Sequence, residues 1–238
     1  MKKLYIILLL ICTGALWSFC QRGSLEDKFV TYTANPSTQK IILYYKDGNG
    51  NRIGSLGNLK KHVEKKGNKL LFAMNGGMFQ KDFSPLGLNI DNGTIVQKLN
   101  TREGNGNFYL KPNGVFYVTK NNTAHISTTP NFNLSKEIKY ATQSGPMLVI
   151  DGKPHDAFKE GSTNVNIRNG VGILPNGDVL FAMSKVEVNF YDFAKYFKDK
   201  GCSNALYLDG FVSRAYVPSQ KWVQTDGDFA VMIGVTEK

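Results

Sequence analysis

Residues 189–210, NFYDFAKYFKDKGCSNALYLDG, carry the pattern that decides the fold. Asn189 is a residue type that caps the start of a helix, and Gly201 is one that ends it. Between them the apolar side chains fall on one helical face: Phe190, Phe193, Ala194 and Phe197. We interpret this stripe as core packing rather than as a ligand site, because burial of apolar area is what such stripes ordinarily do. The run Ala205–Leu208 then predicts a strand directly after the helix.

A second helix is predicted upstream, where Leu56, Leu59 and Val63 repeat at helical spacing and Gly67 is placed to end the helix. Short β-branched or aromatic runs bounded by turn residues predict the strands. They are Lys40–Tyr45, Lys69–Met74, Asn107–Leu110, Val115–Thr119, Met147–Ile150, Val179–Met183 and Ala205–Leu208.

Turn sequences favour hairpins at four places: DNG at 91–93, KPNG at 111–114, DG at 151–152 and LPNG at 174–177. Hairpins join antiparallel neighbours, so much of the sheet should be antiparallel. The sequence therefore predicts an α+β fold of twisted, largely antiparallel sheets with a few packed helices, in a single domain.

Length and composition agree with one globular domain. The chain has 238 residues, of which 42% are hydrophobic and 20% charged, which argues against disorder and against a polytopic membrane protein. The net charge of +10 can attract nucleic acid, an anionic surface or a phosphate-bearing substrate. Because the lysines are spread over turns and helix faces rather than clustered with aromatic residues, we expect no nucleic-acid partner.

The N-terminus predicts an export signal over residues 1–20, because Lys2 and Lys3 precede the apolar run Leu4–Trp17. That run is short for a transmembrane span, and an uncleaved anchor is left open. Cleavage after Cys20 and lipidation of Cys20 are both open, and either places the protein in the periplasm or cell envelope. The membrane would be contacted only through the signal or a lipid anchor.

Residues 21–27 then form a linker, and residues 28–238 form the domain. Signal removal leaves Cys202 as the single cysteine of the mature chain, so no internal disulfide is expected.

Several common functional motifs are absent from the sequence: the P-loop, the G-x-S-x-G elbow and the H-E-x-x-H pair. The histidines lack cysteine partners, which argues against a zinc site. We therefore predict no cofactor, while a divalent metal is left open. Residues 47–51, DGNGN, begin like a calcium loop, but Arg52 and Asn58 stand where glycine and glutamate are needed, so we predict a hairpin turn.

Polar clusters stand where strands are expected to begin or end. They are Asn75-Gly76-Gly77, Gln143-Ser144-Gly145-Pro146, Arg168 with Asn169-Gly170, and Leu208-Asp209-Gly210 followed by Ser213 and Arg214. Taken singly, each is also compatible with an ordinary turn or with a buried structural Asp-Arg pair.

The order of these clusters resembles the phosphodiester glycosidase family, which includes the mannose 6-phosphate uncovering enzyme and many bacterial exported proteins. The family pattern is a strand followed by N-G-G-[FY]-F, then G-P-x-L, R-x-x-x-G, a helix, and L-D-G-G-G-S. The corresponding segments here are NGGMF at 75–79, GPML at 145–148, RNGVG at 168–172, the helix at 190–197 and LDGFVS at 208–213. The resemblance runs from about Lys69 to Val235. Met78 replaces an aromatic residue and Phe211-Val212 replace two glycines, differences that concern the substrate more than the fold.

The resemblance implies hydrolysis of a sugar 1-phosphodiester, such as an N-acetylglucosamine 1-phosphodiester, at the anomeric carbon. The expected partner is accordingly a phosphorylated glycan or a small sugar phosphodiester. Asp209 is the candidate nucleophile or general base, and Arg168 is the candidate phosphate clamp through its planar fork. Glu187 is the candidate second carboxylate, with a solvated loop glutamate as the alternative. Asn75 would hold sugar hydroxyls or orient water. The candidate substrate-binding residues are Gly76, Gly77, Gln143, Ser144, Gly145, Gly210, Ser213 and Arg214.

Two other classes of function stay open at this point. One is a non-catalytic binding module for phosphorylated or acidic envelope glycans. The other is a structural envelope protein whose Asp-Arg pair is buried and which has no cleft. The catalytic hypothesis requires Asn75, Gly145, Arg168 and Asp209 to line one cleft, because residues so far apart in sequence act together only when the fold gathers them.

Overall fold

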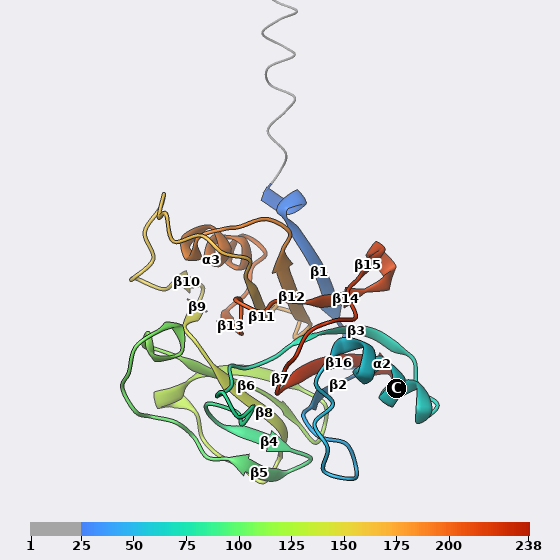
Figure 1. Cartoon of the computed structure of the whole chain (residues 1–238). Helices are drawn as coiled ribbons and strands as arrows, with labels where there is room; N and C mark the ends of the chain where they lie inside the picture. The colour runs from blue at the N-terminus through green and yellow to red at the C-terminus, as the bar shows by residue number, and fades with distance from the viewer. Residues whose placement is uncertain (1–24) are drawn as a thin grey trace, which may run out of the picture.

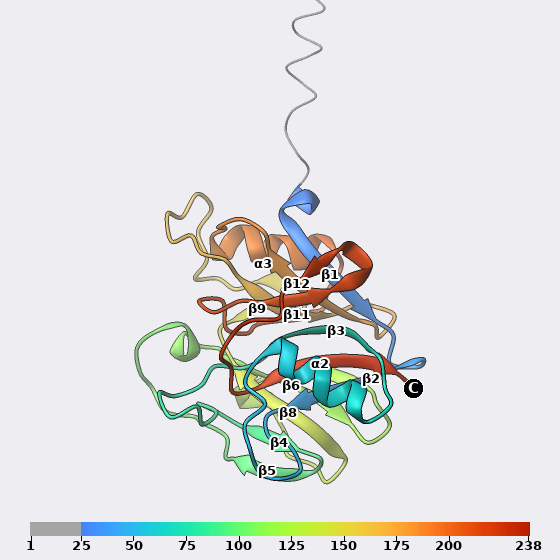
Figure 2. The ribbon, with the colours of Figure 1, turned by 45° about the vertical axis from the view of Figure 1, so that its right-hand side comes forward.

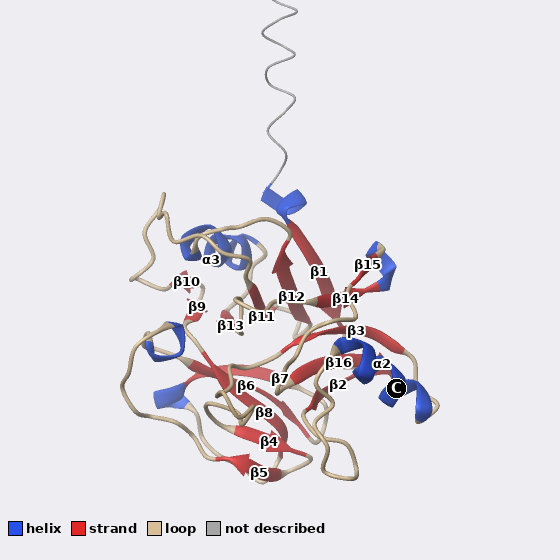
Figure 3. Ribbon diagram, in the orientation of Figure 1, coloured by secondary structure: helices blue, strands red, loops and turns tan. Residues whose placement is uncertain are grey.

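The computed structural model describes residues 25–238, which form three antiparallel sheets and two α-helices (Figure 1). The predicted signal peptide and most of the predicted linker lie outside the described residues. Strands dominate the molecule, with the helices on its outside (Figure 3). All strand pairs among residues 25–238 are antiparallel, as the hairpin turns predict.

The first sheet has the order β1 (Phe29–Ala34), β12 (Val179–Ser184), β11 (Asn169–Ile173), β13 (Asn204–Tyr207), β9 (Met147–Ile150) and β10 (Lys153–Pro154). The second sheet has the order β15 (Trp222–Val223), β14 (Ala215–Val217), β3 (Leu70–Asn75), β16 (Met232–Glu237) and β2 (Gln39–Tyr44). The third sheet has the order β5 (Thr94–Gln97), β4 (Asn89–Asp91), β8 (Ile138–Ser144), β6 (Gly114–Thr119) and β7 (Ala124–Thr128). Short 3-10 turns occur at Leu25–Lys28, Asn107–Tyr109, Thr129–Asn131 and Pro218–Gln220.

The three sheets share one apolar core. Phe72 of β3, Phe116 of β6 and Phe181 of β12 each come from a different sheet and are buried. The ring centroids of Phe72 and Phe181 are 4.8 Å apart, and those of Phe116 and Phe181 are 6.2 Å apart. Aromatic pairs at such separations stabilise a core beyond the area that they bury.

Both predicted helices are present. In α2 (Leu56–Lys65) the Ser55 side chain caps the first turn by accepting from the Asn58 backbone N–H at 3.2 Å, and the apolar stripe faces the second sheet. In α3 (Phe190–Asp199) the Asn189 carboxamide accepts from the Asp192 backbone N–H at 2.8 Å. The phenylalanine stripe of α3 packs on the first sheet, which confirms its interpretation as core.

One predicted strand and its hairpin are wrong. Residues 107–109 form a 3-10 turn that buries Phe108, and the Asn113 carboxamide donates to the Phe108 carbonyl at 3.0 Å. The aromatic run therefore buries apolar area through the ring of Phe108 and does so without pairing to another strand. The turns at 91–93, 151–152 and 174–177 do join antiparallel neighbours, and residues 47–51 turn between the bridged pair Lys46 and Arg52.

Candidate active site

Hydrogen bonds join predicted polar residues of all three sheets: Asn75 and Ser144 both donate to the segment that follows β13. Figure 2 shows α3 above the first sheet and the other two sheets below it. Five strand ends contribute: the ends of β3, β8 and β13 and the starts of β11 and β14. Antiparallel order brings these ends together, because β11 pairs with β13 and β14 pairs with β3. The topology thus unites segments that are distant in the sequence.

Two buried carboxamides tie these strand ends together. Asn75 Nδ2 donates to the backbone carbonyl of Asp209 at 2.7 Å. Asn169 Nδ2 donates to both the backbone carbonyl and Oδ1 of Asn75, each at 3.0 Å, and Asn169 Oδ1 accepts from the Asp209 backbone N–H at 3.0 Å. Asn75 Oδ1 also accepts from the Arg214 backbone N–H at 3.0 Å. The backbone of Asp209 is therefore held on both its donor and its acceptor side.

The Asp209 carboxylate has a different environment from its backbone. It is partly buried and, among residues 25–238, accepts no hydrogen bond and joins no ion pair. Burial raises the pKa of this carboxyl from 3.8 to about 6. A carboxylate that is fixed through its backbone while its oxygens stay unengaged can act on a bound molecule or water.

Arg168 is fully buried, with 0% of its surface exposed, and its guanidinium is held mainly by carbonyl groups. Nε donates to the Val188 carbonyl and Nη2 to the Asn164 carbonyl, both at 2.8 Å, while the guanidinium stacks 3.6 Å from the centre of the Phe190 ring. Burial lowers the pKa of Arg168, yet a guanidinium keeps its charge in proteins. Nη1 is enclosed by protein and has no hydrogen-bond partner by geometry among residues 25–238, while the Tyr207 side chain lies beside the guanidinium and acts to raise its pKa.

The alternative of a buried structural Asp-Arg pair does not describe this arrangement, because Arg168 and Asp209 form no ion pair. Tyr207 connects the two regions instead. Its ring lies 5.6 Å from the Arg168 guanidinium carbon, and its hydroxyl accepts from the Gly210 backbone N–H at 3.0 Å. The loop that follows Asp209 is thereby folded back over Tyr207.

Close packing explains two of the glycines predicted to bind substrate. A Cβ on Gly210 would lie 2.0 Å from the Tyr207 hydroxyl oxygen, and a Cβ on Gly77 would lie 2.2 Å from Thr142 Oγ1. Only glycine fits such spaces. Gly76 donates its backbone N–H to the Val231 carbonyl at 2.8 Å. This N–H therefore holds the end of β3 in place and is not available to a ligand.

Ser144 and Ser213 fasten the segments around Asp209. Ser144 Oγ donates to the Leu208 carbonyl at 2.7 Å, and Ser213 Oγ donates to the Gly210 carbonyl at 2.8 Å. Gly145 follows Ser144 at the crossing from β8 to β9, next to the strand end that carries Asp209. The GP segment therefore reaches the same junction as Asn75 and Asp209.

Gln143 lies elsewhere, in a buried network of the third sheet. Its Oε1 accepts from the Leu88 and Asn100 backbone N–H groups at 3.0 and 2.8 Å. Its Nε2 donates to the Asn100 carbonyl at 2.7 Å and to Thr129 Oγ1 at 3.1 Å. These bonds engage both ends of the amide, which gives Gln143 a scaffolding position.

Three further residues lie in loops that follow or precede these strand ends and are at least partly exposed. Glu187 is exposed in the loop before α3, next to the Val188 carbonyl that holds Arg168. Phe211 is 91% exposed in the loop directly after Gly210, so the side chain that replaces a family glycine projects outward. Arg214 forms an ion pair with Asp226, with Nε and Oδ2 2.8 Å apart.

Two residues of the junction were not predicted as site residues: Asn169, which the sequence places only beside Arg168 in a polar cluster, and Tyr207. Asn169 occupies an unspecified position of the R-x-x-x-G pattern, and Tyr207 looked like one more apolar residue of a strand. Side chains alternate along a strand, so Asn169 is expected to point to the opposite side from Arg168. That alternation is the one feature of the sequence that could have indicated a separate role for Asn169. Among residues 25–238, no group of three or more His, Cys, Asp or Glu side chains is arranged to hold a metal ion. In the same part of the chain, none of the helices combines the length and apolar character of a membrane crossing.

Comparison with known proteins identifies the family. The family model described as phosphodiester glycosidase matches residues 68–235. The chain belongs to the phosphodiester glycosidase family. It is 36% identical over 247 residues to the uncharacterized protein YigE of Escherichia coli (strain K12), a match that covers 100% of this chain and 94% of that protein.

Solved structures share the fold at low sequence identity. The catalytic domain of zebrafish N-acetylglucosamine-1-phosphodiester alpha-N-acetylglucosaminidase, auto-inhibited by its pro-peptide, is 18% identical with a TM-score of 0.54, covering 89% of each chain. A hypothetical protein from Synechocystis is 14% identical with a TM-score of 0.55, covering 88% of this chain and 59% of that one. A putative exported protein from Burkholderia pseudomallei K96243 is 12% identical with a TM-score of 0.55, covering 87% and 73%.

Proposed function

We propose that this phosphodiester glycosidase family member hydrolyses a sugar 1-phosphodiester of the N-acetylglucosamine 1-phosphate type at its anomeric carbon. Family membership supports a glycosidase-type hydrolase. The observation that carries the proposal is the unengaged Asp209 carboxylate, whose backbone is held by Asn75 and Asn169. The products would be the free sugar and a phosphate monoester.

The leaving group suits this set of side chains. A phosphate monoester has a second pKa of about 6, so it departs with much less protonation than an alkoxide requires. A buried cation can then stabilise the departing charge in place of a strong acid. Arg168 would supply the cation: its Nη1 has no hydrogen-bond partner by geometry among residues 25–238, and because it is enclosed by protein, a phosphate oxygen would reach it only after the side chains around it move.

Asp209 would supply the attack on the sugar. As a nucleophile, its carboxylate forms a bond to the anomeric carbon while the carbon–oxygen bond to phosphate breaks and the phosphate leaves with the electron pair; water then hydrolyses the glycosyl ester. As a general base, it accepts a proton from the water that attacks the same carbon. A carboxyl with a pKa of about 6 suits base catalysis near neutral pH.

Glu187 is the proposed second carboxylate, which activates water or the leaving group from the loop before α3. Its exposure leaves it open to solvent and substrate alike. The two-carboxylate mechanism expects Glu187→Gln to lower turnover by about 100-fold or more. Unchanged turnover would assign Glu187 to the solvated surface and leave Asp209 as the single catalytic carboxylate.

We also propose that the protein works outside the cytoplasm, in the periplasm or cell envelope. The two lysines and the apolar run at the N-terminus support export. N-terminal sequencing and mass measurement of the mature protein test this, since they should find a start near Gln21 or a lipid on Cys20. Soluble cytoplasmic protein that retains Met1 would overturn export.

The function is tested by incubating the protein with an N-acetylglucosamine 1-phosphodiester and separating the products by chromatography. Release of N-acetylglucosamine together with the phosphate monoester supports the proposal. Saturable binding without release would favour the glycan-binding alternative, and the proposed activity would be withdrawn. If the protein neither binds nor hydrolyses this substrate, both the proposed activity and the glycan-binding alternative are overturned.

A further inference from the structure

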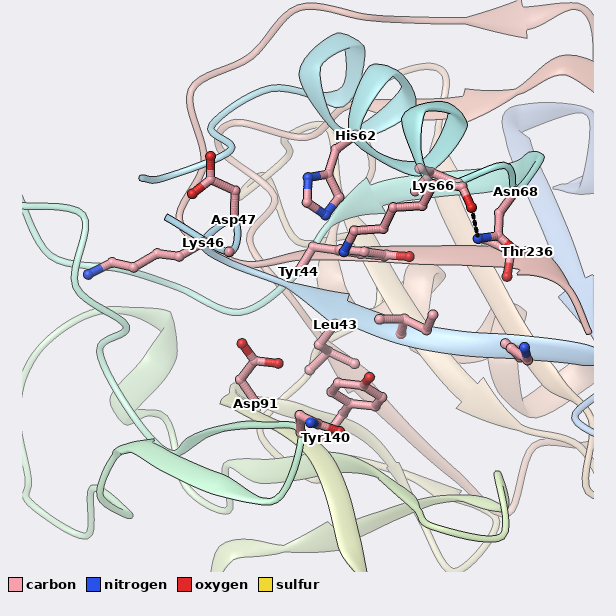
Figure 4. A pocket seen from close by; sticks show the side chains of 15 residues that line it. Leu43, Tyr44, Lys46, Asp47, His62, Lys66, Asn68, Asp91, Tyr140 and Thr236 are labelled. Atoms are coloured by element: carbon pink, nitrogen blue, oxygen red, sulfur yellow. Dashed lines mark hydrogen bonds between the residues drawn. The ribbon is translucent and has the colours of Figure 1, made fainter. Parts of the chain in front are cut away.

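A pocket lies away from the candidate active site. It has a volume of about 420 Å³ and opens between β2, the C-terminal part of α2, the β4–β5 turn and β8 (Figure 4). Neither Asn75 nor Asp209 lines it. Volumes of this size are typical of sites for small molecules.

Opposite charges face each other across this pocket without meeting. Burial raises the pKa of Asp91, and the positive charge of Lys66 acts against that shift, so the two groups sense each other. They nevertheless form no ion pair, and neither side chain hydrogen-bonds to another described residue. Figure 4 shows Lys66 reaching over the pocket from the α2 side and Asp91 standing on the opposite wall. The space between them suits a molecule that offers an anion to one side and hydroxyl groups to the other.

Two tyrosines and a histidine complete the polar walls. Tyr44 and Tyr140 are partly buried, burial raises the pKa of both phenols, and their hydroxyls have no hydrogen-bond partner among residues 25–238. The ring of His62 meets the Tyr44 ring edge-on, with centroids 6.1 Å apart, and burial lowers the pKa of His62. Neutral phenols and a neutral imidazole can donate and accept hydrogen bonds, and the rings offer flat apolar faces.

We propose that this pocket binds an anionic saccharide, a sugar unit that carries a phosphate or carboxylate group. The anion would lie toward the ammonium of Lys66, sugar hydroxyls would donate to the Asp91 carboxylate, and the ring would rest against Tyr44 and Tyr140. Lysine is a common point-charge partner for phosphate, and a carboxylate accepts from paired hydroxyls. The proposal rests on this pocket alone and does not depend on the proposed hydrolysis.

The test is a titration of the protein with glucose 6-phosphate, followed by isothermal calorimetry and amide chemical shifts, with glucose and inorganic phosphate as separate probes. We expect saturable binding in the millimolar range or tighter, shifts around Tyr44 and Asp91, and binding of each separate probe weaker by about tenfold. Lys66→Gln and Asp91→Asn should each weaken glucose 6-phosphate binding by about tenfold. The neighbouring exposed variant Lys65→Gln is the matched control and should leave binding unchanged.

Three results would overturn the proposal: no saturable binding, binding that Lys66→Gln and Asp91→Asn leave intact, or inorganic phosphate binding as tightly as the sugar phosphate. Thermal unfolding of each variant excludes a folding defect as the cause of weaker binding. Asp209→Asn should leave the shifts around Tyr44 and Asp91 unchanged. That result separates this pocket from the candidate active site, so failure of one assignment is distinguishable from failure of the other.

Discussion

The Asn75 carboxamide donates a 2.7 Å hydrogen bond to the backbone carbonyl of Asp209, a residue 134 positions later in the chain. This bond joins the end of β3 in the second sheet to the end of β13 in the first sheet. Asn169 completes the junction by accepting from the Asp209 N–H and donating to Asn75. Because these hydrogen bonds are made by the backbone of Asp209, they fix the position of the residue and leave its carboxylate free of structural hydrogen bonds.

Asp209→Asn should abolish turnover while substrate binding and fold are retained. The amide keeps the shape of the side chain but is neither an anionic nucleophile nor a base, so we expect kcat to fall by at least about a thousandfold. Steady-state kinetics, ligand titration and circular dichroism measure the three properties. Asp156→Asn, at an exposed aspartate, is the matched control and should retain wild-type turnover. Near-normal turnover by folded Asp209→Asn protein would remove Asp209 from the mechanism.

The raised pKa of Asp209 also predicts how stability depends on pH. In the folded protein the Asp209 carboxyl stays protonated up to about pH 6. In the unfolded chain, where its pKa has the ordinary value of 3.8, it loses the proton at lower pH. Burial of the charge therefore lowers stability as pH rises through that window, and the cost is fully present above about pH 6. Asp209→Asn removes the cost, so the variant should be more stable near neutral pH by up to about 3 kcal/mol and similar to wild type near pH 3.5.

Denaturant unfolding of both proteins at the two pH values measures this difference. Activity gives a second readout, because an ionised Asp209 is required: kcat/KM should rise with pH through about 6. A stability difference that does not change with pH would contradict the buried, unengaged state of this carboxylate.

Arg168→Lys should impair binding and turnover together. Lysine keeps a charge but loses the planar fork, the bonds to the Val188 and Asn164 carbonyls and the stacking on Phe190. We expect kcat/KM to fall by about 10- to 100-fold, with an increase in KM and a loss of about 1–3 kcal/mol in unfolding free energy. Arg102→Lys, at an exposed arginine, serves as the control. An unchanged KM would remove Arg168 from phosphate binding.

Asn169→Ala should act differently, through position rather than contact with substrate. It leaves the Asp209 N–H and the Asn75 carbonyl without their partners, so unfolding free energy should fall by about 2–3 kcal/mol. Displacement of Asp209 should lower kcat by about 10- to 100-fold while KM changes little. Asn121→Ala, at an exposed asparagine, controls for the substitution itself. Loss of stability with wild-type kcat would make Asn169 purely structural.

Local patterns were sufficient for the two helices, for three of the four predicted hairpin turns and for six strands. Six of the seven predicted strands are present within a residue at each end, because their apolar runs are bounded by residues with turn geometry. The strand β16 is one of those not predicted: it is almost wholly buried, so it shows no alternation, and Gly234 interrupts its β-branched run. The strand predicted at 107–110 is absent because the segment buries the ring of Phe108 from a 3-10 turn and does not need a strand partner to bury its apolar area.

The candidate site could be predicted only in part, for a reason that lies in the contacts. Asn75 and Asp209 end strands, which is visible in the sequence, whereas the roles of Gln143 and Asn169 depend on partners that are remote along the chain. Both are buried polar residues beside a motif residue. Gln143 meets Asn100 and the third sheet, while Asn169 meets Asn75 and Asp209. Such partners are set by the meeting of the three sheets and leave no local pattern.

Hydrolysis of an N-acetylglucosamine 1-phosphodiester in ¹⁸O-labelled water tests the central claim most directly. Attack at the anomeric carbon breaks the carbon–oxygen bond, so mass spectrometry should find the label in the sugar and none in the phosphate monoester. The label should appear in the sugar whether Asp209 acts as nucleophile or as base. Label in the phosphate monoester, or substrate binding with no hydrolysis, would contradict the assignment of this site as a phosphodiester glycosidase.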